Sequence, residues 1–111
     1  MSSTSSTKPP VHPGAILRTQ FMERYSLSAS ALAIRLHVPA PRVNDIVRER
    51  RGISPDSALR LARFFRTTAQ YWMDLQTAYD LSLAQAQAGE QIVREVLPVA
   101  VDANEPAPIA A

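Results

Sequence analysis

Cysteine is absent from the 111-residue sequence, which excludes a disulfide framework and a thiolate metal site. Glycine is scarce: Gly14, Gly52 and Gly89 stand far apart, so no glycine-rich loop could hold a phosphate group. The two histidines, His12 and His37, do not have the spacing of a helical metal-binding pair. The usual residues of a metal-dependent or nucleotide-dependent enzyme are therefore missing, and we expect no catalytic residue, no metal and no cofactor.

Long apolar runs are missing as well. No stretch approaches the ~20 apolar residues that a membrane-spanning helix needs. The Ser/Thr-rich N-terminus has no apolar centre like that of a secretory signal. The length suits one domain with a single modest core. We therefore expect a cytoplasmic protein with no membrane partner.

The net charge is only +2, but the positive charge is concentrated. Residues 42–66 contain seven arginines and three acidic residues, a net charge of +4 in one segment. Arginine suits phosphate groups and base edges because its planar fork donates two parallel hydrogen bonds. The plainer interpretation is a solvated, salt-bridged face, and we expect part of the cluster to be one.

Apolar residues in segment 28–47 follow two short helical patterns. One set repeats at 32, 33 and 36, and a second repeats at 43, 46 and 47. The three residues between the two patterns, 37–39, are too few for anything but a sharp turn. Ser28 can cap the first helix. Small Ala33 suits the point where two crossing helices approach most closely.

The turn itself is specified by three residues. His37 lies where the backbone must reverse, and histidine tolerates a left-handed conformation better than most non-glycine residues. Val38 is apolar and fits the gap between the two helices. Pro39 precedes a second helix that should start near Ala40, because proline is tolerated only at or before the first turn of a helix. The segment predicts a helix-turn-helix; a helical hairpin in a plain bundle is the alternative.

The flanking segments predict three further helices. One covers about 15–25. A second starts at Ser54 as N-cap, with Pro55 at its first position, and runs to about Phe65. A third follows a capping box at 67–70 and runs to about Gln87, with its inner face marked by Trp72, Leu75, Tyr79 and Leu83. Gly52 is expected to supply a left-handed turn.

These patterns divide the chain into three parts. We expect a disordered tail at 1–11, a helix-turn-helix DNA-binding domain at 12–87, and a largely disordered C-terminal extension at 88–111. Within the extension, the apolar segment 92–101 could be a strand, a partner-binding segment or a loose continuation. The fold class is all-α, with five helices and flexible termini.

Short motifs then indicate a family. The chain resembles the HigA-type antitoxins of the lambda-repressor-like helix-turn-helix class through HPGAILR at 12–18, RGIS at 51–54, ALRLA at 58–62, YWMDLQ at 71–76 and YDL at 79–81. Together these motifs cover about residues 12–82. The resemblance implies an antitoxin that neutralises a HigB-like endoribonuclease toxin and, as a homodimer, represses its own operon on double-stranded operator DNA.

The DNA-reading region departs from that family. Ala29 and Ala31 replace polar residues at the start of the first motif helix. Ala40 and Pro41 open the second helix where Gln or Ser often reads bases. Glu49 stands where a turn glycine is usual. These differences move base reading to other side chains and leave the operator sequence undefined.

The candidate DNA-binding residues fall into two groups. Arg42 and Asn44 are placed to read bases, since Arg pairs with guanine and Asn with adenine. Phosphate contacts are assigned to a second group: Ser28, Ser30, Arg48, Arg50 and Arg51. A local side-chain hydrogen bond is the alternative for Asn44. Asp45 should pair with an arginine, because phosphate would repel it.

Two alternatives to the antitoxin stay open at this point. One is a stand-alone helix-turn-helix repressor with no toxin partner. The other is a helical interaction module in which the arginines serve solubility and protein contacts. Trp72 and Tyr79 could in principle stack on bases, but their helical spacing favours the core. If the chain is an antitoxin, the apolar segment 92–101 is a candidate to cover the ribonuclease, and the end at 107–111 could be a handle for regulated proteolysis.

Overall fold

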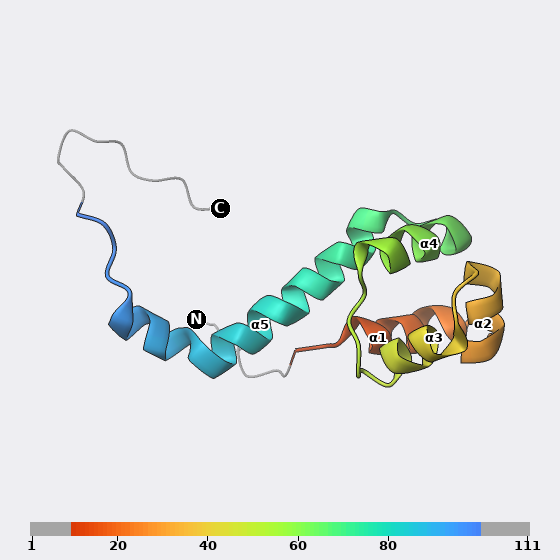
Figure 1. Cartoon of the computed structure of the whole chain (residues 1–111), viewed down its shortest axis with the longest axis horizontal. Helices are drawn as coiled ribbons and strands as arrows, with labels where there is room; N and C mark the ends of the chain where they lie inside the picture. Colours follow the sequence, from red (N-terminus) through yellow and green to blue (C-terminus); the bar gives the residue numbers. More distant parts are fainter. Residues whose placement is uncertain (1–9, 101–111) are drawn as a thin grey trace.

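The computed structural model describes residues 10–100, and in this range the chain is all-α. The helices are α1 (Pro13–Ile16), which continues into a π-helical segment η2 (Leu17–Met22), then α2 (Ala29–Leu36), α3 (Ala40–Val47), α4 (Pro55–Phe65) and α5 (Ala69–Glu95). The predicted five-helix fold is confirmed. Helices α1 to α4 and the first part of α5 form the compact end of the molecule, and the rest of α5 projects away from it (Figure 1). Most of the tail predicted at 1–11, and the end of the extension, lie outside the described residues.

The core is built around Trp72, whose side chain is fully buried. Its ring lies 4.8 Å from that of Phe21, and Phe21 lies 5.0 Å from Phe65. The indole nitrogen Nε1 donates a 2.7 Å hydrogen bond to Thr67 Oγ1, so the one polar atom of the buried ring is satisfied. Trp72 is therefore a core residue, as its spacing predicted, and is not available to stack on bases.

Left-handed backbone at the ends of helices is supplied without glycine. Ser26, His37, Glu49 and Arg66 have φ between 54° and 63°, and no glycine in the described residues has a positive φ. The prediction for His37 is confirmed, whereas the one for Gly52 is wrong. A Cβ on Gly52 would lie 2.8 Å from the side-chain amide of Gln76, so this amide would have to move. That amide accepts a 2.6 Å hydrogen bond from the backbone nitrogen of Ile53.

Three predicted boundaries were also wrong. The first helix begins at Pro13 rather than at residue 15, because the His12 side chain caps it. The N-cap of α5 is Thr68, whose hydroxyl accepts from Tyr71 N at 3.0 Å, while the Thr67 hydroxyl is taken by Trp72. Helix α5 does not end near Gln87 but continues to Glu95, since one interior glycine costs only about 1 kcal/mol.

The buried face of α5 is shorter than the sequence pattern predicted. Trp72 is buried and Tyr79 is partly buried against the ring of His12, with 4.8 Å between ring centroids. Leu83 is 36% exposed, so its inward placement was wrong. The core contacts of α5 thus end about one turn before Leu83. Beyond this point no other helix of residues 10–100 packs against α5 (Figure 1).

Candidate nucleic-acid interface

The bend between α2 and α3 has the geometry that the sequence predicted. Ser28 caps α2, its Oγ accepting from Ala31 N at 3.1 Å. At the other end, left-handed His37 lets the nitrogen of Val38 donate to Ala33 O at 3.1 Å, which closes the helix. Pro39 is the N-cap of α3, so α3 starts at Ala40. The two helices form a helix-turn-helix.

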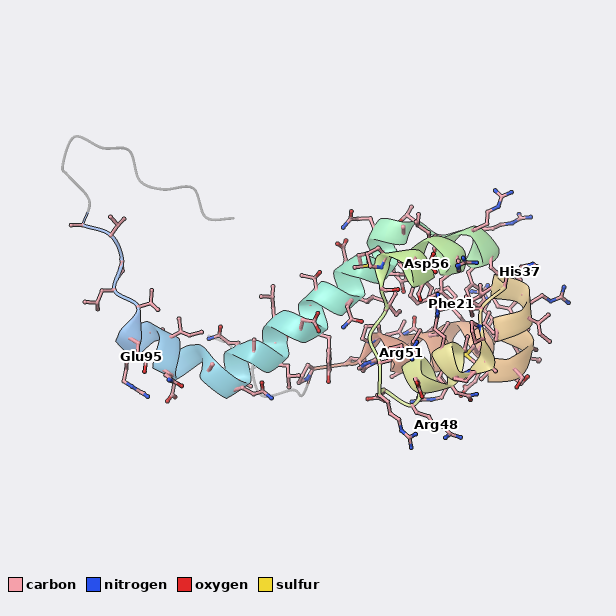
Figure 2. All side chains as sticks on the ribbon, viewed as in Figure 1. Phe21, His37, Arg48, Arg51, Asp56 and Glu95 are labelled. Atoms are coloured by element: carbon pink, nitrogen blue, oxygen red, sulfur yellow. The ribbon has the colours of Figure 1, made fainter. Side chains whose placement is uncertain are left out.

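Helix α3 presents its polar side to solvent. Val43 and Ile46 are each 2% exposed and hold the opposite side in the core. On the outward side Pro41 and Arg48 are exposed and Asn44 is partly exposed, so the polar groups that this side offers are those of Asn44 and Arg48. Figure 2 shows the side chain of Arg48 pointing away from the domain. A rod with its polar side outward is the arrangement that can enter a major groove.

Arg42 is held beside this outward side rather than on it. Its Nη1 donates to Asp56 Oδ2 at 2.7 Å, and Arg60 Nε donates to the same oxygen at 2.8 Å. The hydrogen bonds from Arg60 and then Arg42 hold the pKa of the Asp56 carboxyl below its usual value, so Asp56 is charged at neutral pH. In this structure Arg42 is therefore engaged by the N-terminal turn of α4.

Arg60 also fixes the end of α2. Its Nη1 donates to the carbonyl oxygen of Leu36 at 2.9 Å, close to the left-handed turn. Asp56 and Arg60 thus connect three elements: the start of α3, the end of α2 and α4. Sequence reasoning did not identify either residue as part of the site. Their i, i+4 spacing on α4 was the available signal.

The segment after α3 forms an exposed basic loop at 48–51. The side chains of Arg48, Arg50 and Arg51 are exposed, and Arg51 pairs with Asp45 at 3.3 Å, as predicted for that aspartate. The turn is closed by Arg50 N donating to Asp45 O at 2.8 Å, with left-handed Glu49 in between. The basic loop therefore has a defined backbone and places three exposed arginines at one end of α3.

Arg18 anchors that loop from η2. Its Nη1 donates to the carbonyl oxygen of Val47 at 2.6 Å, and its Nη2 lies 4.0 Å from Glu49 Oε2. The Arg18 guanidinium thereby satisfies a free carbonyl at the C-terminal end of α3, and its positive charge interacts favourably with the negative end of the helix dipole. The two predicted serines lie at the other end of the motif: Ser28 accepts as the α2 cap and can still donate its hydroxyl proton, and Ser30 is exposed.

The start of α1 supports α3 from behind. Gly14 approaches the backbone of Ile46 so closely that a Cβ would overlap the carbonyl oxygen and lie 2.8 Å from the carbonyl carbon. The nitrogen of Gly14 donates to His12 Nδ1 at 2.9 Å. Burial lowers the pKa of His12 below its ordinary value, and the carboxylates of Glu49 and Asp80 oppose that shift weakly. His12 is thus a neutral acceptor at the helix start, which is a structural role.

Two other kinds of feature are absent from residues 10–100. This part of the chain holds no group of three or more His, Asp and Glu side chains that could bind a metal ion. None of its helices has both the length and the apolar character needed to cross a membrane.

This arrangement is that of a helix-turn-helix DNA-binding domain. No protein-family model matches the chain, but individual relatives do. Virulence-associated protein I of Dichelobacter nodosus is 48% identical over 96 residues, which is 86% of this chain and 87% of the relative. The helix-turn-helix transcriptional regulator YbaQ of Escherichia coli is 37% identical over 68% of this chain and 66% of its own.

Solved structures identify the family. The Pseudomonas aeruginosa antitoxin HigA, determined with the higBA promoter, is 54% identical with a TM-score of 0.80, over 82% of this chain and 99% of its own. Antitoxin GraA in complex with its operator is 46% identical with a TM-score of 0.80, over 85% and 95%. The chain belongs to the HigA-type antitoxin family.

Proposed function

We propose that this chain is the antitoxin of a type II toxin–antitoxin module. In this proposal it binds and neutralises a HigB-like endoribonuclease, and it represses its own operon as a homodimer on operator DNA. It performs no catalytic step and acts in the cytoplasm, where its DNA and its toxin are found. Support comes from the family, from relatives whose structures contain promoter or operator DNA, and from the surface of α3.

One observation carries the DNA-binding half of the proposal. The exposed side of α3 has Asn44 at its centre and Arg48 at its end, while Val43 and Ile46 hold the other side in the core. In the major groove Asn can pair with adenine, and each good base contact is worth about 1–3 kcal/mol of discrimination. Arg42 lies at the edge of this side and can reach a guanine only by leaving Asp56.

Phosphate contacts would come from both ends of the motif. We assign Arg48, Arg50 and Arg51 in the basic loop to one strand, and Ser28 with Ser30 at the start of α2 to the other. If a dimer neutralises about six phosphates, the logarithm of the binding constant should fall with log salt at a slope near −5. Two recognition helices related by a two-fold axis should meet half-sites about 34 Å apart.

A gel shift with the protein's own promoter tests this half. Asn44→Ala should reduce the preference for promoter over random DNA, while Arg50→Ala should weaken binding to both and make the salt slope shallower by about 1. Arg94→Ala is the matched control, because it removes an arginine from the far end of α5. Equal affinity of the parent protein for promoter and random DNA would contradict the repressor role.

A repressor without a toxin is the second candidate, since one relative is described only as a transcriptional regulator. A reading frame for a short basic ribonuclease beside this gene favours the antitoxin, and its absence favours the repressor. We also propose that residues 12–87 suffice for DNA binding and that 88–111 form an extension with another role. A chain truncated after Gln87 that no longer binds the promoter would contradict this division.

A further inference from the structure

Charge in the described residues is separated between the two ends of the molecule. Residues 10–66 contain ten arginines and four acidic residues, a net charge of +6. Residues 67–100 contain one arginine and four acidic residues, a net charge of −3. The positive part is the compact end with the DNA-binding surface, and the negative part is α5 with its continuation (Figure 1). DNA therefore suits only one end.

The negative end also exposes apolar side chains. Residues 10–100 contain twelve large exposed apolar side chains, and seven of them lie between 81 and 99. Leu81 is 65% exposed, Ile92 51% and Val93 74%. A helix that packs against nothing is marginal in water, and an apolar patch of this kind marks an interaction site. Among residues 10–100, no other helix packs against the distal half of α5, and its exposed apolar side chains form a candidate interaction surface.

One side of α5 combines both properties. Asp74, Leu81, Ala88, Ile92 and Glu95 follow one another at helical spacings of three, four and seven, on the side opposite Trp72. We call this set the outer stripe. It is apolar in the middle and acidic at both ends. Ala88 at its centre would let another chain approach closely.

We propose that the outer stripe is the docking surface for the toxin, a basic ribonuclease, and that DNA and toxin bind at opposite ends of the chain. This inference rests on the proposed function. An enzyme that cleaves RNA must attract a polyanion and therefore carries a positive surface. Such a surface is complementary to the acidic ends of the stripe, and complementary charge speeds association and selects the partner.

A second copy of this chain fits the stripe less well. In an antiparallel pair that brings Leu81 against Ala88, Asp74 of one copy faces Glu95 of the other. A parallel pair in register brings each acidic residue against itself. Like charges facing each other are destabilising in both cases. The stripe is therefore suited to a basic partner rather than to a copy of itself.

The test uses the full chain and a catalytically inactive form of the ribonuclease encoded beside this gene. Leu81→Ser with Ile92→Ser removes the apolar centre, and Asp74→Lys with Glu95→Lys reverses the charge at both ends. The control is Ile34→Ser with Leu59→Ser, which removes the same residue types from exposed positions on α2 and α4. Calorimetry gives ribonuclease affinity, a gel shift gives operator affinity, and light scattering gives molar mass.

We expect each outer-stripe variant to lose about 100-fold or more in ribonuclease affinity, with operator affinity and molar mass unchanged. The control should bind ribonuclease like the parent, and adding ribonuclease to the protein–DNA complex should give a slower band. Parental ribonuclease affinity in both stripe variants would overturn the docking surface while leaving the proposed function intact. A fall in molar mass would assign the stripe to a second copy and also overturn it. A parent protein that does not bind the ribonuclease at all would refute both the proposed function and this inference.

Discussion

The contact between Gly14 and α3 makes a sharp prediction about one methyl group. A Cβ on Gly14 would overlap the carbonyl oxygen of Ile46 and lie 2.8 Å from its carbonyl carbon. Both clashing atoms belong to the backbone near the end of α3, so no side-chain rotation can relieve the overlap. In Gly14→Ala, α1 and α3 must move apart.

The expected cost follows from the packing of the site. Ile46 of α3 is 2% exposed, and Pro13 and Gly14 of α1 are buried, so the two helices meet inside the core. Overpacking of this kind typically costs about 1–3 kcal/mol. In a domain of this size, where each kcal/mol shifts Tm by about 4–8 °C, Gly14→Ala should melt about 5–20 °C below the parent. Operator affinity should also fall, because α3 is displaced.

Gly89→Ala is the matched control, because the same methyl group meets a different neighbour. A Cβ on Gly89 would approach the side chain of Gln85, and the 2.4–3.5 Å contacts all belong to a flexible group that can turn away. The residue lies within α5, where Ala is favoured over Gly by about 1 kcal/mol. Gly89→Ala should therefore be neutral or slightly stabilising. Urea unfolding measures both variants, and a Gly14→Ala protein within 0.5 kcal/mol of the parent, a threshold of about the size of a neutral surface change, would refute the argument.

Three further predictions concern single side chains. Burial lowers the pKa of His12, so as the pH falls the unfolded state takes up a proton on His12 before the folded state does. The free energy of unfolding should therefore be constant above the unfolded-state pKa of His12 and decrease below it. His12→Asn should lose this pH dependence in urea titrations between pH 8 and pH 5. Glu49→Gly should relieve the strain of a left-handed residue and remove a negative charge from the basic loop, so operator affinity should rise at low salt and match that of the parent at high salt. Glu49→Ala removes the same charge and should raise operator affinity in the same way, but the protein should be less stable because alanine disfavours the left-handed backbone. Thr67→Val should cost about 1–3 kcal/mol because it leaves Trp72 Nε1 buried without an acceptor, whereas Thr68→Ala should cost about 1 kcal/mol as a lost cap; equal losses in thermal melts would contradict this assignment.

The features predicted correctly from the sequence are local ones. The caps at Ser28 and Ser54, Pro55 in the first turn of α4, and the left-handed His37 all depend on residues within four positions of one another. A capping hydroxyl finds its partner three residues away wherever the helix lies in the fold. The helix-turn-helix was therefore predictable, including the start of α3 at Ala40.

The features that were missed depend on residues distant in sequence. Gly52 was expected to turn the chain, but its role is set by Gln76, on another helix. Arg42 was expected to be free for DNA, but its Nη1 lies 2.7 Å from Oδ2 of Asp56, fourteen residues along the chain in the first turn of α4. The end of α5 differs from the prediction for a different reason: Gly89 does not stop the helix, because one interior glycine costs only about 1 kcal/mol.

The pairing of Arg42 with Asp56 has a measurable consequence for DNA binding. An exposed ion pair contributes little to stability and is weakened by salt, whereas a bidentate contact with guanine is worth about 1–3 kcal/mol. Exchange of Asp56 for a base is therefore favourable, and Arg60, still bound to Leu36 O, would keep the carboxylate partnered. We expect Asp56→Asn to raise operator affinity at low salt, because it removes the competing carboxylate, and to leave discrimination against a mutated operator unchanged.

The control is Asp74→Asn, which removes the same charge from α5, far along the chain from the recognition helix. Gel shifts at two salt concentrations, with the intact and a mutated operator, separate the two roles that Asp56 could have. If Asp56 only holds Arg42 while DNA is absent, its loss changes affinity alone. If discrimination fell in Asp56→Asn but not in Asp74→Asn, Asp56 would instead be the residue that aims Arg42 at its base, and the exchange argued above would be wrong.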